Sequence, residues 1–460
     1  MTKTEAKQFW APIINDFQPL DSTWLGEIDK FYVDRSAGDP TNSALQLLKE
    51  GLLASLDRAK PYRALLTGHR GAGKSSELIR LAEELAEDFF VVRFDAELTL
   101  SPETTNHFDI ILGMGIAVFA TAQLKDMKPS KKLADDLLKS LSKFIQKYED
   151  RKGFKLDLAS LVKQVAVGIV NVSAVGVVTG GNPAALVAAT AFQATKLELN
   201  VSDEHIRTLE LLPNRIEVIS ALNKIIEWVQ DECGKRVLMI VDGLDKVATP
   251  RARLLFADSS LLRDPMCALV YAAPIVFYYR AAAWQAEHIF DAYEMLPNVP
   301  VCQQPSREKN HLEPRELSPS GLEVMREVVA RRLDKHGHSV DDVFTAEAMS
   351  MLAQMSGGVM RQLILRFNNA ATYAKMMGRD KIDHELAHKS VMAHRKQLKT
   401  RLNADYRKAL LAVLSERSLC GGGSQEAEDE MLTNDYLLSY RDENDAWFDV
   451  HPNALPLLRS

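Results

Sequence analysis

The stretch LLTGHRGAGKS, residues 65–75, decides the fold of this 460-residue chain. Its last eight residues, Gly68 to Ser75, match the pattern GxxxxGK[ST]. An apolar run precedes the match, and a helical pattern with Leu78, Ile79 and Leu81 follows it. Glycines let backbone N–H groups surround phosphate oxygens, and the start of a helix adds partial positive charge. The stretch therefore predicts a phosphate-binding loop (P-loop) in an α/β domain.

Every position of this loop, and the residue after it, is a candidate nucleotide-binding residue. Lys74 is expected to contact the β- and γ-phosphates, and the Ser75 hydroxyl is expected to bind Mg²⁺. The expected ligands are ATP and Mg²⁺. The predicted nucleotide-binding residues are Gly68, His69, Arg70, Gly71, Ala72, Gly73, Lys74, Ser75 and Ser76.

A second acidic site follows another apolar run, Val237–Val241, which ends in Asp242. We expect Asp242 to hold Mg²⁺ together with Ser75. Many hydrolysing P-loop enzymes carry Glu at the next position, but Gly243 stands there, so the general base is less evident. Asp245 is the nearest acidic residue that could polarise the attacking water. The other candidates are Glu77, Asp95 and Glu97.

Short apolar runs alternate with helical patterns, which predicts a mostly parallel sheet with helices on both faces. The expected strands are Tyr62–Thr67, Phe89–Phe94, Val237–Val241, Ala268–Tyr279 and Val299–Gln303. Residues 1–43 read as a polar lead-in and 44–315 as the P-loop core. Residues 316–402 are helical throughout, and 403–460 carry a helix and a hairpin, Tyr436–Arg441 with Ala446–Val450.

Composition is that of an ordinary globular protein, with 46% hydrophobic and 26% charged residues. The net charge of −6 does not favour non-specific nucleic-acid binding. Four dispersed cysteines form no CxxC pair, which argues against a disulfide framework and a structural zinc site. The N-terminus lacks a secretory pattern, so we expect a cytoplasmic protein.

One segment, residues 164–195 within an expected insertion at about 155–200, contains no charged residue. Its length would allow a membrane span, but the sequence Gly180-Gly181-Asn182-Pro183 divides it into two short pieces. We therefore favour a buried or interface element over a membrane-inserting one.

Four stretches together resemble AAA+ and STAND-type P-loop ATPases, nearest to the origin-recognition clade. They are TGHRGAGKSSEL, IVDGLDK, LVYAAPIVF and SGGVMRQLI, which begin at residues 67, 240, 269 and 356. The resemblance implies ATP hydrolysis and a helical lid at 316–402. In that family a GxxR arginine on the lid contacts the γ-phosphate, and Gly358 to Arg361 match this motif. Arg361 is therefore a candidate catalytic residue beside Lys74, Asp242 and Asp245.

Two departures from the family pattern concern other site positions. The strand after Asp242 ends in Tyr271-Ala272-Ala273-Pro274, where such proteins usually carry a polar residue. Arg280 is similar to the strand-terminal arginine of STAND proteins, and Arg263 stands where an arginine finger acting on a neighbouring subunit could lie. A finger of that kind would make activity depend on a homo-oligomer.

Residues 403–460 resemble a winged helix, which binds DNA in origin-type relatives. From residue 401 onward, however, the chain has six basic and eleven acidic residues. The helix that would enter a groove, Gln425–Leu432, is itself acidic and would repel phosphates. A protein-contact or autoinhibitory domain is the expectation.

The leading hypothesis is an ATP-hydrolysing switch that couples nucleotide state to self-assembly or to a protein effector, with bacterial defence as a setting implied by the resemblance. The alternatives are a DNA-handling ATPase, such as a loader or transposition regulator, and a membrane-acting assembly that uses residues 164–195.

Overall fold

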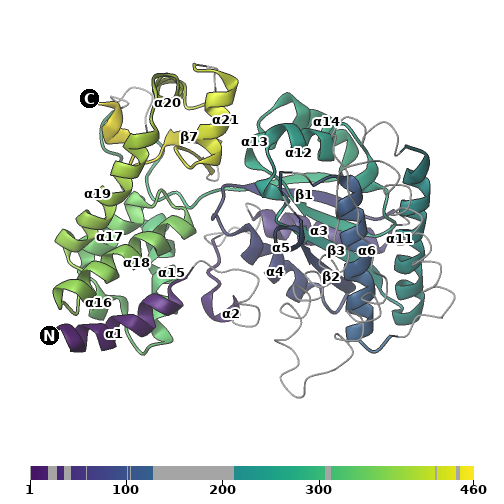
Figure 1. Ribbon diagram of the computed structural model, residues 1–460, viewed down its shortest axis with the longest axis horizontal. Coiled ribbons are helices and arrows are strands. Elements are labelled where there is room, and N and C mark those ends of the chain that lie inside the picture. Colours follow the sequence, from purple (N-terminus) through teal and green to yellow (C-terminus); the bar gives the residue numbers. More distant parts are fainter. Residues whose placement is uncertain are drawn as a thin grey trace, which may run out of the picture.

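The structure is a computed structural model that describes residues 2–18, 28–35, 43–58, 60–100, 102–103, 105–127, 212–305, 312–419, 422–441 and 446–459. The charge-free segment 164–195 and the insertion around it lie outside the described residues. Three regions are visible: an α/β core, a helical lid beside it, and a small C-terminal module next to both (Figure 1). Within the described ranges, no helix combines the length and apolarity needed to cross a membrane.

The core is built on a parallel sheet with strand order β2-β3-β4-β1-β5. The strands are β1 (Arg63–Gly68), β2 (Phe89–Asp95), β3 (Arg236–Asp242), β4 (Ala268–Ala272) and β5 (Ala292–Leu296). Their apolar runs are buried on both faces, as is typical of parallel strands covered by helices. The carboxyl ends of the strands lie at one edge, which faces the lid.

Helices cover both faces of the sheet, as the sequence predicted. In β1, Ala64 and Leu66 pack against α3 (Ala44–Leu56) and α4 (Lys74–Glu84). The side chain of Leu65 points to the opposite face, into the cluster formed with α6 (His107–Leu124) and α11 (Leu212–Cys233). The remaining described elements of the core are α2 (Ile28–Phe31), α5 (Ala96–Thr99), η3 (Leu244–Lys246), α12 (Thr249–Phe256), η4 (Leu261–Arg263), α13 (Ile275–Tyr278) and α14 (Ala281–Ile289).

Two strand predictions need correction. The run Ala268–Tyr279 is a strand only as far as Ala272, because Pro274 ends the pairing and serves as the N-cap of α13. The run Val299–Gln303 is not a strand of the sheet. The fifth strand is instead β5, Ala292–Leu296, a sheet-edge strand whose sequence AYEML is less apolar.

The lid contains α15 (Pro319–Asp334), α16 (Val340–Val343), α17 (Ala346–Met355), α18 (Met360–Met377) and α19 (His384–Arg401). The N-terminal helix α1 (Lys3–Asp16) lies against α18, although the sequence reading assigned residues 1–43 no packing role (Figure 1). The Trp10 indole donates to the Arg379 carbonyl at 2.7 Å, and Phe17 stacks on Phe367 with ring centroids 3.7 Å apart. This helix is therefore part of the lid's hydrophobic core.

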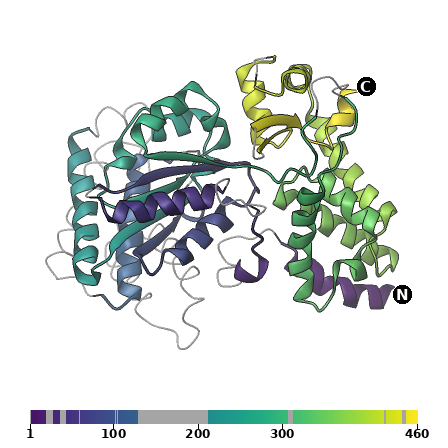
Figure 2. The same ribbon diagram turned by 180° about the vertical axis from the view of Figure 1, so that it is seen from behind.

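The C-terminal module contains α20 (Ala404–Glu416), α21 (Gln425–Thr433), the antiparallel hairpin β6 (Leu437–Arg441) and β7 (Ala446–Val450), and the short helix η5 (Leu455–Leu458). The helix and the hairpin lie where the sequence predicted them. The module packs against both the lid and the core (Figure 2). Its hydrophobic cluster includes Leu398 from α19 and both Ile275 and Val276 from α13 of the core.

Candidate nucleotide-binding site

The P-loop connects the end of β1 to the start of α4. Gly71 and Gly73 have φ angles of +83° and +108°, a region of backbone space that side chains with a Cβ rarely adopt. The α4 helix has no side-chain cap at Gly73, so its first backbone N–H groups are left for an external acceptor. The loop sequence therefore produces an anion site at a helix N-terminus.

Lys74 is buried at the centre of the site. Its ammonium donates to the carbonyl oxygens of Gly68 and His69 at 2.9 and 3.0 Å. It also forms an ion pair with the Asp245 carboxylate at 2.7 Å. The structure thus brings together two of the predicted catalytic residues and pairs them with each other.

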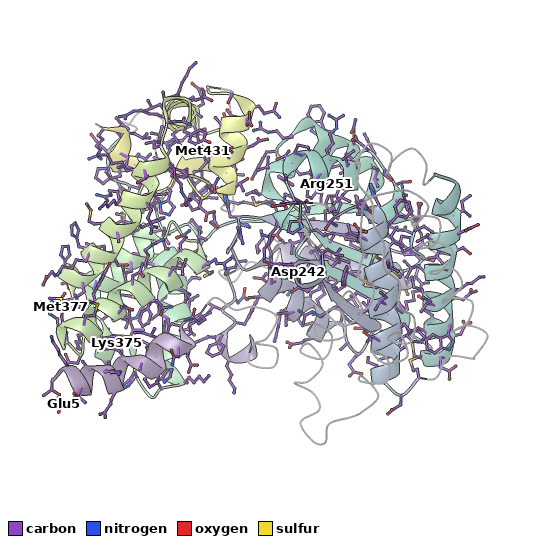
Figure 3. All side chains as sticks on the ribbon, in the orientation of Figure 1. Glu5, Asp242, Arg251, Lys375, Met377 and Met431 are labelled. Atoms are coloured by element: carbon purple, nitrogen blue, oxygen red, sulfur yellow. The ribbon has the colours of Figure 1, made fainter. Side chains whose placement is uncertain are left out.

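Asp242 ends β3 on the side of the core that faces the lid (Figure 3). Burial and the charges of Asp245 and Asp95 raise the pKa of its carboxyl group to about 6, against hydrogen bonds from Ser75 and the Gly243 N–H. Hydroxyl and carboxylate oxygens are the ligands that Mg²⁺ takes. Ser75 and Asp242 would hold the ion, which would supply positive charge beside the phosphates and relieve the crowding of carboxylates.

The other candidate bases have different partners. Asp95 lies level with Asp242 on the neighbouring strand β2. Glu97, two residues after Asp95, forms an ion pair with Lys246. Glu77, in the first turn of α4, accepts from Arg35 and from the Tyr32 hydroxyl, each at 3.1 Å.

The lid contacts the P-loop through the predicted GxxR motif. The Arg361 N–H donates to the Gly71 carbonyl at 3.1 Å, and a Cβ added to Gly71 would lie 2.4 Å from the Arg361 Cβ. Earlier in the motif, a Cβ on Gly358 would lie 1.8 Å from the Val299 carbonyl oxygen. The motif glycine therefore allows the start of α18 to approach the core, and Arg361 lines the same cavity as the P-loop.

These groups surround one cavity of about 660 Å³. Its lining includes the P-loop, Asp242 and Asp245, together with apolar side chains from the N-terminal segment, α4 and the lid. The apolar lining residues are Phe31, Val33, Ile79, Val328, Met360 and Ile364. The cavity therefore offers both charged groups and apolar surface to a ligand.

Sequence reasoning missed several residues of this cavity. The segment Phe31–Arg35 passes beside the P-loop, where Arg35 donates to the Ala72 carbonyl at 2.7 Å. Lys246 also lines the cavity, and burial together with Arg70, Arg361 and Lys74 lowers its pKa to about 8. Arg93 from β2 and Arg332 from α15 complete the cationic lining. Of these residues, only Lys246 carried a sequence signal, because it directly follows Asp245.

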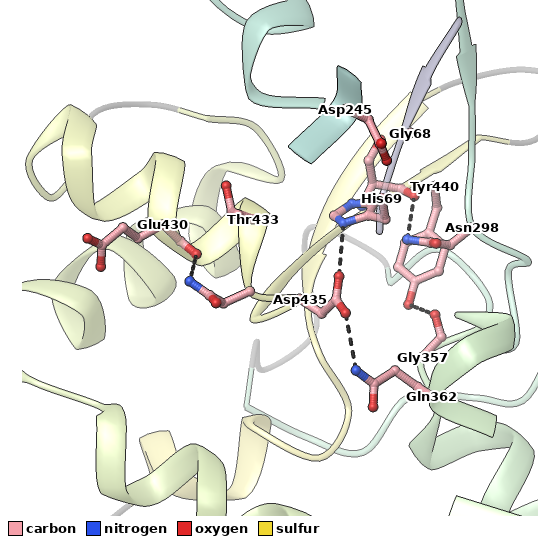
Figure 4. A network of polar contacts seen from close by, with 12 residues as sticks. Gly68, His69, Asp245, Asn298, Gly357, Gln362, Glu430, Thr433, Asp435 and Tyr440 are labelled. Carbon is pink, nitrogen blue, oxygen red and sulfur yellow. Dashed lines mark hydrogen bonds and ion pairs between the residues drawn. The ribbon is translucent and has the colours of Figure 1, made fainter. Parts of the chain in front are cut away.

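His69, inside the P-loop, points away from the cavity and contacts the C-terminal module. It is fully buried, and its Nε2 accepts the Ser439 N–H of β6 at 2.9 Å. Its Nδ1 lies 3.4 Å from the Asp435 carboxylate, which also accepts from Gln362 of the lid at 3.2 Å (Figure 4). One P-loop side chain therefore touches the module, which in turn is bonded to the lid.

Arg280 and Arg263 do not line the cavity. Arg280, after α13, donates from Nε to the Asp429 carboxylate at 2.7 Å and lies 3.4 Å from Glu428. Both acidic residues belong to α21, so the acidic helix of the module lies on the core. Arg263 lies in η4.

The comparison with protein families agrees with this geometry. Residues 47–264 match the KAP family P-loop domain. The KAP match extends from α3 to η4 and includes the P-loop, Asp242 and Asp245, while the lid and the C-terminal module lie beyond it. The expected resemblance to P-loop ATPases is confirmed. No curated protein sequence gives a significant match to the chain.

Solved structures with a similar arrangement include Cdc6p from Pyrobaculum aerophilum, at 13% identity, 93% coverage of each chain and a TM-score of 0.38. The Aeropyrum pernix ORC1 protein, solved in complex with DNA, is 12% identical, with 93% and 96% coverage and a TM-score of 0.38. The Thermotoga maritima RuvB Holliday junction branch migration motor is 12% identical, with 92% and 95% coverage and a TM-score of 0.35.

Proposed function

We propose that this chain is a Mg²⁺-dependent, ATP-binding and ATP-hydrolysing switch whose nucleotide state sets the position of its lid and C-terminal module. The observation that carries the proposal is the contact between the P-loop residue His69 and Ser439 of the module, at 2.9 Å. A loop that binds phosphates on one side and contacts a second domain on the other would couple phosphate binding to the position of that domain. The switch would control self-assembly or the binding of a protein effector.

Hydrolysis in this proposal depends on the pair formed by Lys74 and Asp245. Triphosphate oxygens in the loop would compete with Asp245 for the Lys74 ammonium, because both are anionic acceptors within its reach. Asp245, once released, would accept a proton from the attacking water. Lys74 would at the same time stabilise charge on the transferred phosphoryl group.

The lid would complete the coupling. Arg361 lies in the first turn of α18, where its N–H donates to Gly71, and Gln362 directly after it donates to Asp435 of the module. A γ-phosphate that attracts the Arg361 guanidinium would shift the start of α18 and, with it, the contact to the module. Hydrolysis removes that attraction. As the module moves, the acidic helix α21 would lose or regain its contact with Arg280.

Small-angle scattering and light scattering on the full chain test this switch. The shape or mass should differ between the ADP state and the state with a non-hydrolysable ATP analogue. Arg361→Ala should remove the difference while the analogue still binds. Arg326→Ala is a matched control, because Arg326 is on the lid surface and pairs with Asp341 at 3.0 Å, away from the cavity. Identical scattering in all nucleotide states of the wild type would contradict the proposal.

A further inference from the structure

Asp435 of the C-terminal module lies where the module, the P-loop and the lid meet. Its two carboxylate oxygens have separate partners. Oδ1 lies 3.4 Å from Nδ1 of His69 in the P-loop, and Oδ2 accepts from Gln362 of the lid at 3.2 Å (Figure 4). The side chain is only 12% exposed, so water does little to weaken these contacts. One carboxylate of the module therefore contacts both other regions of the chain.

The hydrogen bonds of His69 determine which of its ring nitrogens carries the proton. Nε2 accepts the Ser439 N–H at 2.9 Å, so this nitrogen carries no proton. A neutral imidazole then has its proton on Nδ1, which faces Asp435. Neither Nδ1 nor the Asp435 Oδ1 has another hydrogen-bond partner among the described residues. Asp435 therefore fixes the tautomer and the orientation of the buried His69 ring.

The backbone of His69 contacts the phosphate-binding lysine. Its carbonyl oxygen accepts from the Lys74 ammonium at 3.0 Å, beside the Gly68 carbonyl at 2.9 Å. Asp435 and Ser439 hold the His69 ring from two sides, and this restrains the backbone that carries the carbonyl group. A displacement of about 1 Å in a site of this kind can reduce activity by about 10²-fold. The position of Lys74 therefore depends on a contact made by the C-terminal module.

We propose that Asp435 is a positioning residue for the P-loop, so that the nucleotide site is fully formed only while the C-terminal module is docked. In the proposed function, nucleotide state moves the module. The reverse influence follows, because a coupling between two binding events acts in both directions. A protein that displaces the module would weaken ATP binding. The inference rests on the proposed function for its ligand, ATP, and names the module residue that regulates the site.

Asp435→Gly and Asp435→Asn in the full chain test the inference. Asp435 has a φ of +60°, which glycine and asparagine both adopt readily, but only asparagine keeps an acceptor for the Nδ1 proton of His69. Asp435→Gly should weaken the binding of a fluorescent ATP analogue and lower kcat/KM, each by about tenfold or more, the usual effect of losing a hydrogen bond to a charged group. Asp435→Asn should recover most of both. Asp126→Gly is the matched control, because Asp126 has the same φ and does not line the cavity.

A double-mutant cycle separates positioning through His69 from a general structural role of Asp435. In the His69→Ala background, Asp435→Gly should cause little further loss, because the ring that Asp435 holds is absent. Equal losses in Asp435→Gly and Asp435→Asn, or a full additional loss in the His69→Ala background, would overturn the inference. Wild-type binding and turnover in Asp435→Gly would do the same.

Nitrogen NMR of the wild-type chain tests the tautomer without a substitution that could affect folding. The His69 signals are assigned by their absence in His69→Ala. The proton should be on Nδ1, and a proton on Nε2 would overturn the inference. Failure of the proposed function looks different: the wild type would bind ATP without hydrolysing it, and the binding measurements would still test the role of Asp435.

Discussion

The ammonium of Lys74 lies 2.7 Å from the carboxylate of Asp245, and the two side chains are only 3% and 10% exposed. The P-loop cation and the candidate base therefore neutralise each other within the site. In the proposed mechanism, a triphosphate competes with Asp245 for Lys74, and Asp245 can act as the base only after this ion pair has opened. Two predictions concern this pair.

Lys74→Ala should weaken ATP binding strongly and reduce turnover by about 10²-fold or more, since it removes a preorganised donor to the phosphates. The fold should persist, because Lys74 packs with the loop rather than with a hydrophobic cluster. Fluorescent nucleotide titration and circular dichroism measure the two effects. A folded variant that binds ATP as tightly as the wild type would exclude the assigned role.

Asp245→Asn should retain ATP binding and lose turnover, because the amide cannot accept the proton of the attacking water. Single-turnover hydrolysis with prebound ATP separates the chemical step from binding. The ATP-bound state should then persist far longer than in the wild type. Unchanged turnover would transfer the role of base to Asp95, Glu97 or Glu77.

His69→Ala should loosen the C-terminal module. The Ser439 amide would lose its acceptor, and hydrogen exchange at that amide should become at least about fivefold faster, as expected for loss of a net contribution of about 1 kcal/mol or more. Arg70→Ala is the neighbouring control, since Arg70 is exposed and lines the cavity instead. The same exchange rate in His69→Ala and the wild type would show that the P-loop does not hold the module.

Arg280→Ala should detach the acidic helix α21 from the core. Its side chain is 16% exposed and donates to the Asp429 carboxylate, so the loss should be about 1–3 kcal/mol in the docking equilibrium. Limited proteolysis of the module and a double-mutant cycle with Asp429→Ala measure it. If the free-energy effects of Arg280→Ala and Asp429→Ala simply add in the double variant, the two residues are not coupled. Arg253→Ala serves as a control, because its pair with Asp258 is exposed.

Acid should destabilise the junction between the lid and the C-terminal module. Burial holds the pKa of His394 at about 3, against an ordinary value of 6.5. Between these values the folded chain binds fewer protons than the unfolded chain, so stability falls as pH drops from 6.5 towards 3. From pH 7 to 5 the loss should be about 2 kcal/mol. Denaturant unfolding at both pH values should show a smaller loss in His394→Gln, which keeps an acceptor for Asn453. Equal losses would contradict the assignment.

The sequence predicted the parts of the fold that local chemistry determines. The P-loop has a fixed residue spacing, and the strands β1, β2 and β3 are short apolar runs. All four lie where expected. The edge strand β5 carries Glu294 and gives a weak apolar pattern, so a neighbouring run was chosen instead. Trp10 is buried in the lid by contact with residues more than 300 positions away. A local hydrophobic pattern cannot reveal such a contact.

The same contrast between local sequence patterns and contacts of distant residues applies to the site. Lys74 and Asp242 follow from motifs and Asp245 from its closeness to Asp242 in the sequence, and the structure places all three on one cavity. Arg35, Arg93 and Arg332 come from three separate segments, and only tertiary packing places them on one cavity. The partner of His69 was equally inaccessible, because a P-loop histidine carries no sequence mark of a contact 370 residues away.

The lid is built from two stretches of the chain that lie far apart in the sequence, α1 before the core and α15 to α19 after it. Both stretches share one hydrophobic cluster, so a displacement of the lid carries the amino-terminal helix with it. A probe fixed to α1 would therefore report motion of the lid from the amino-terminal end of the chain.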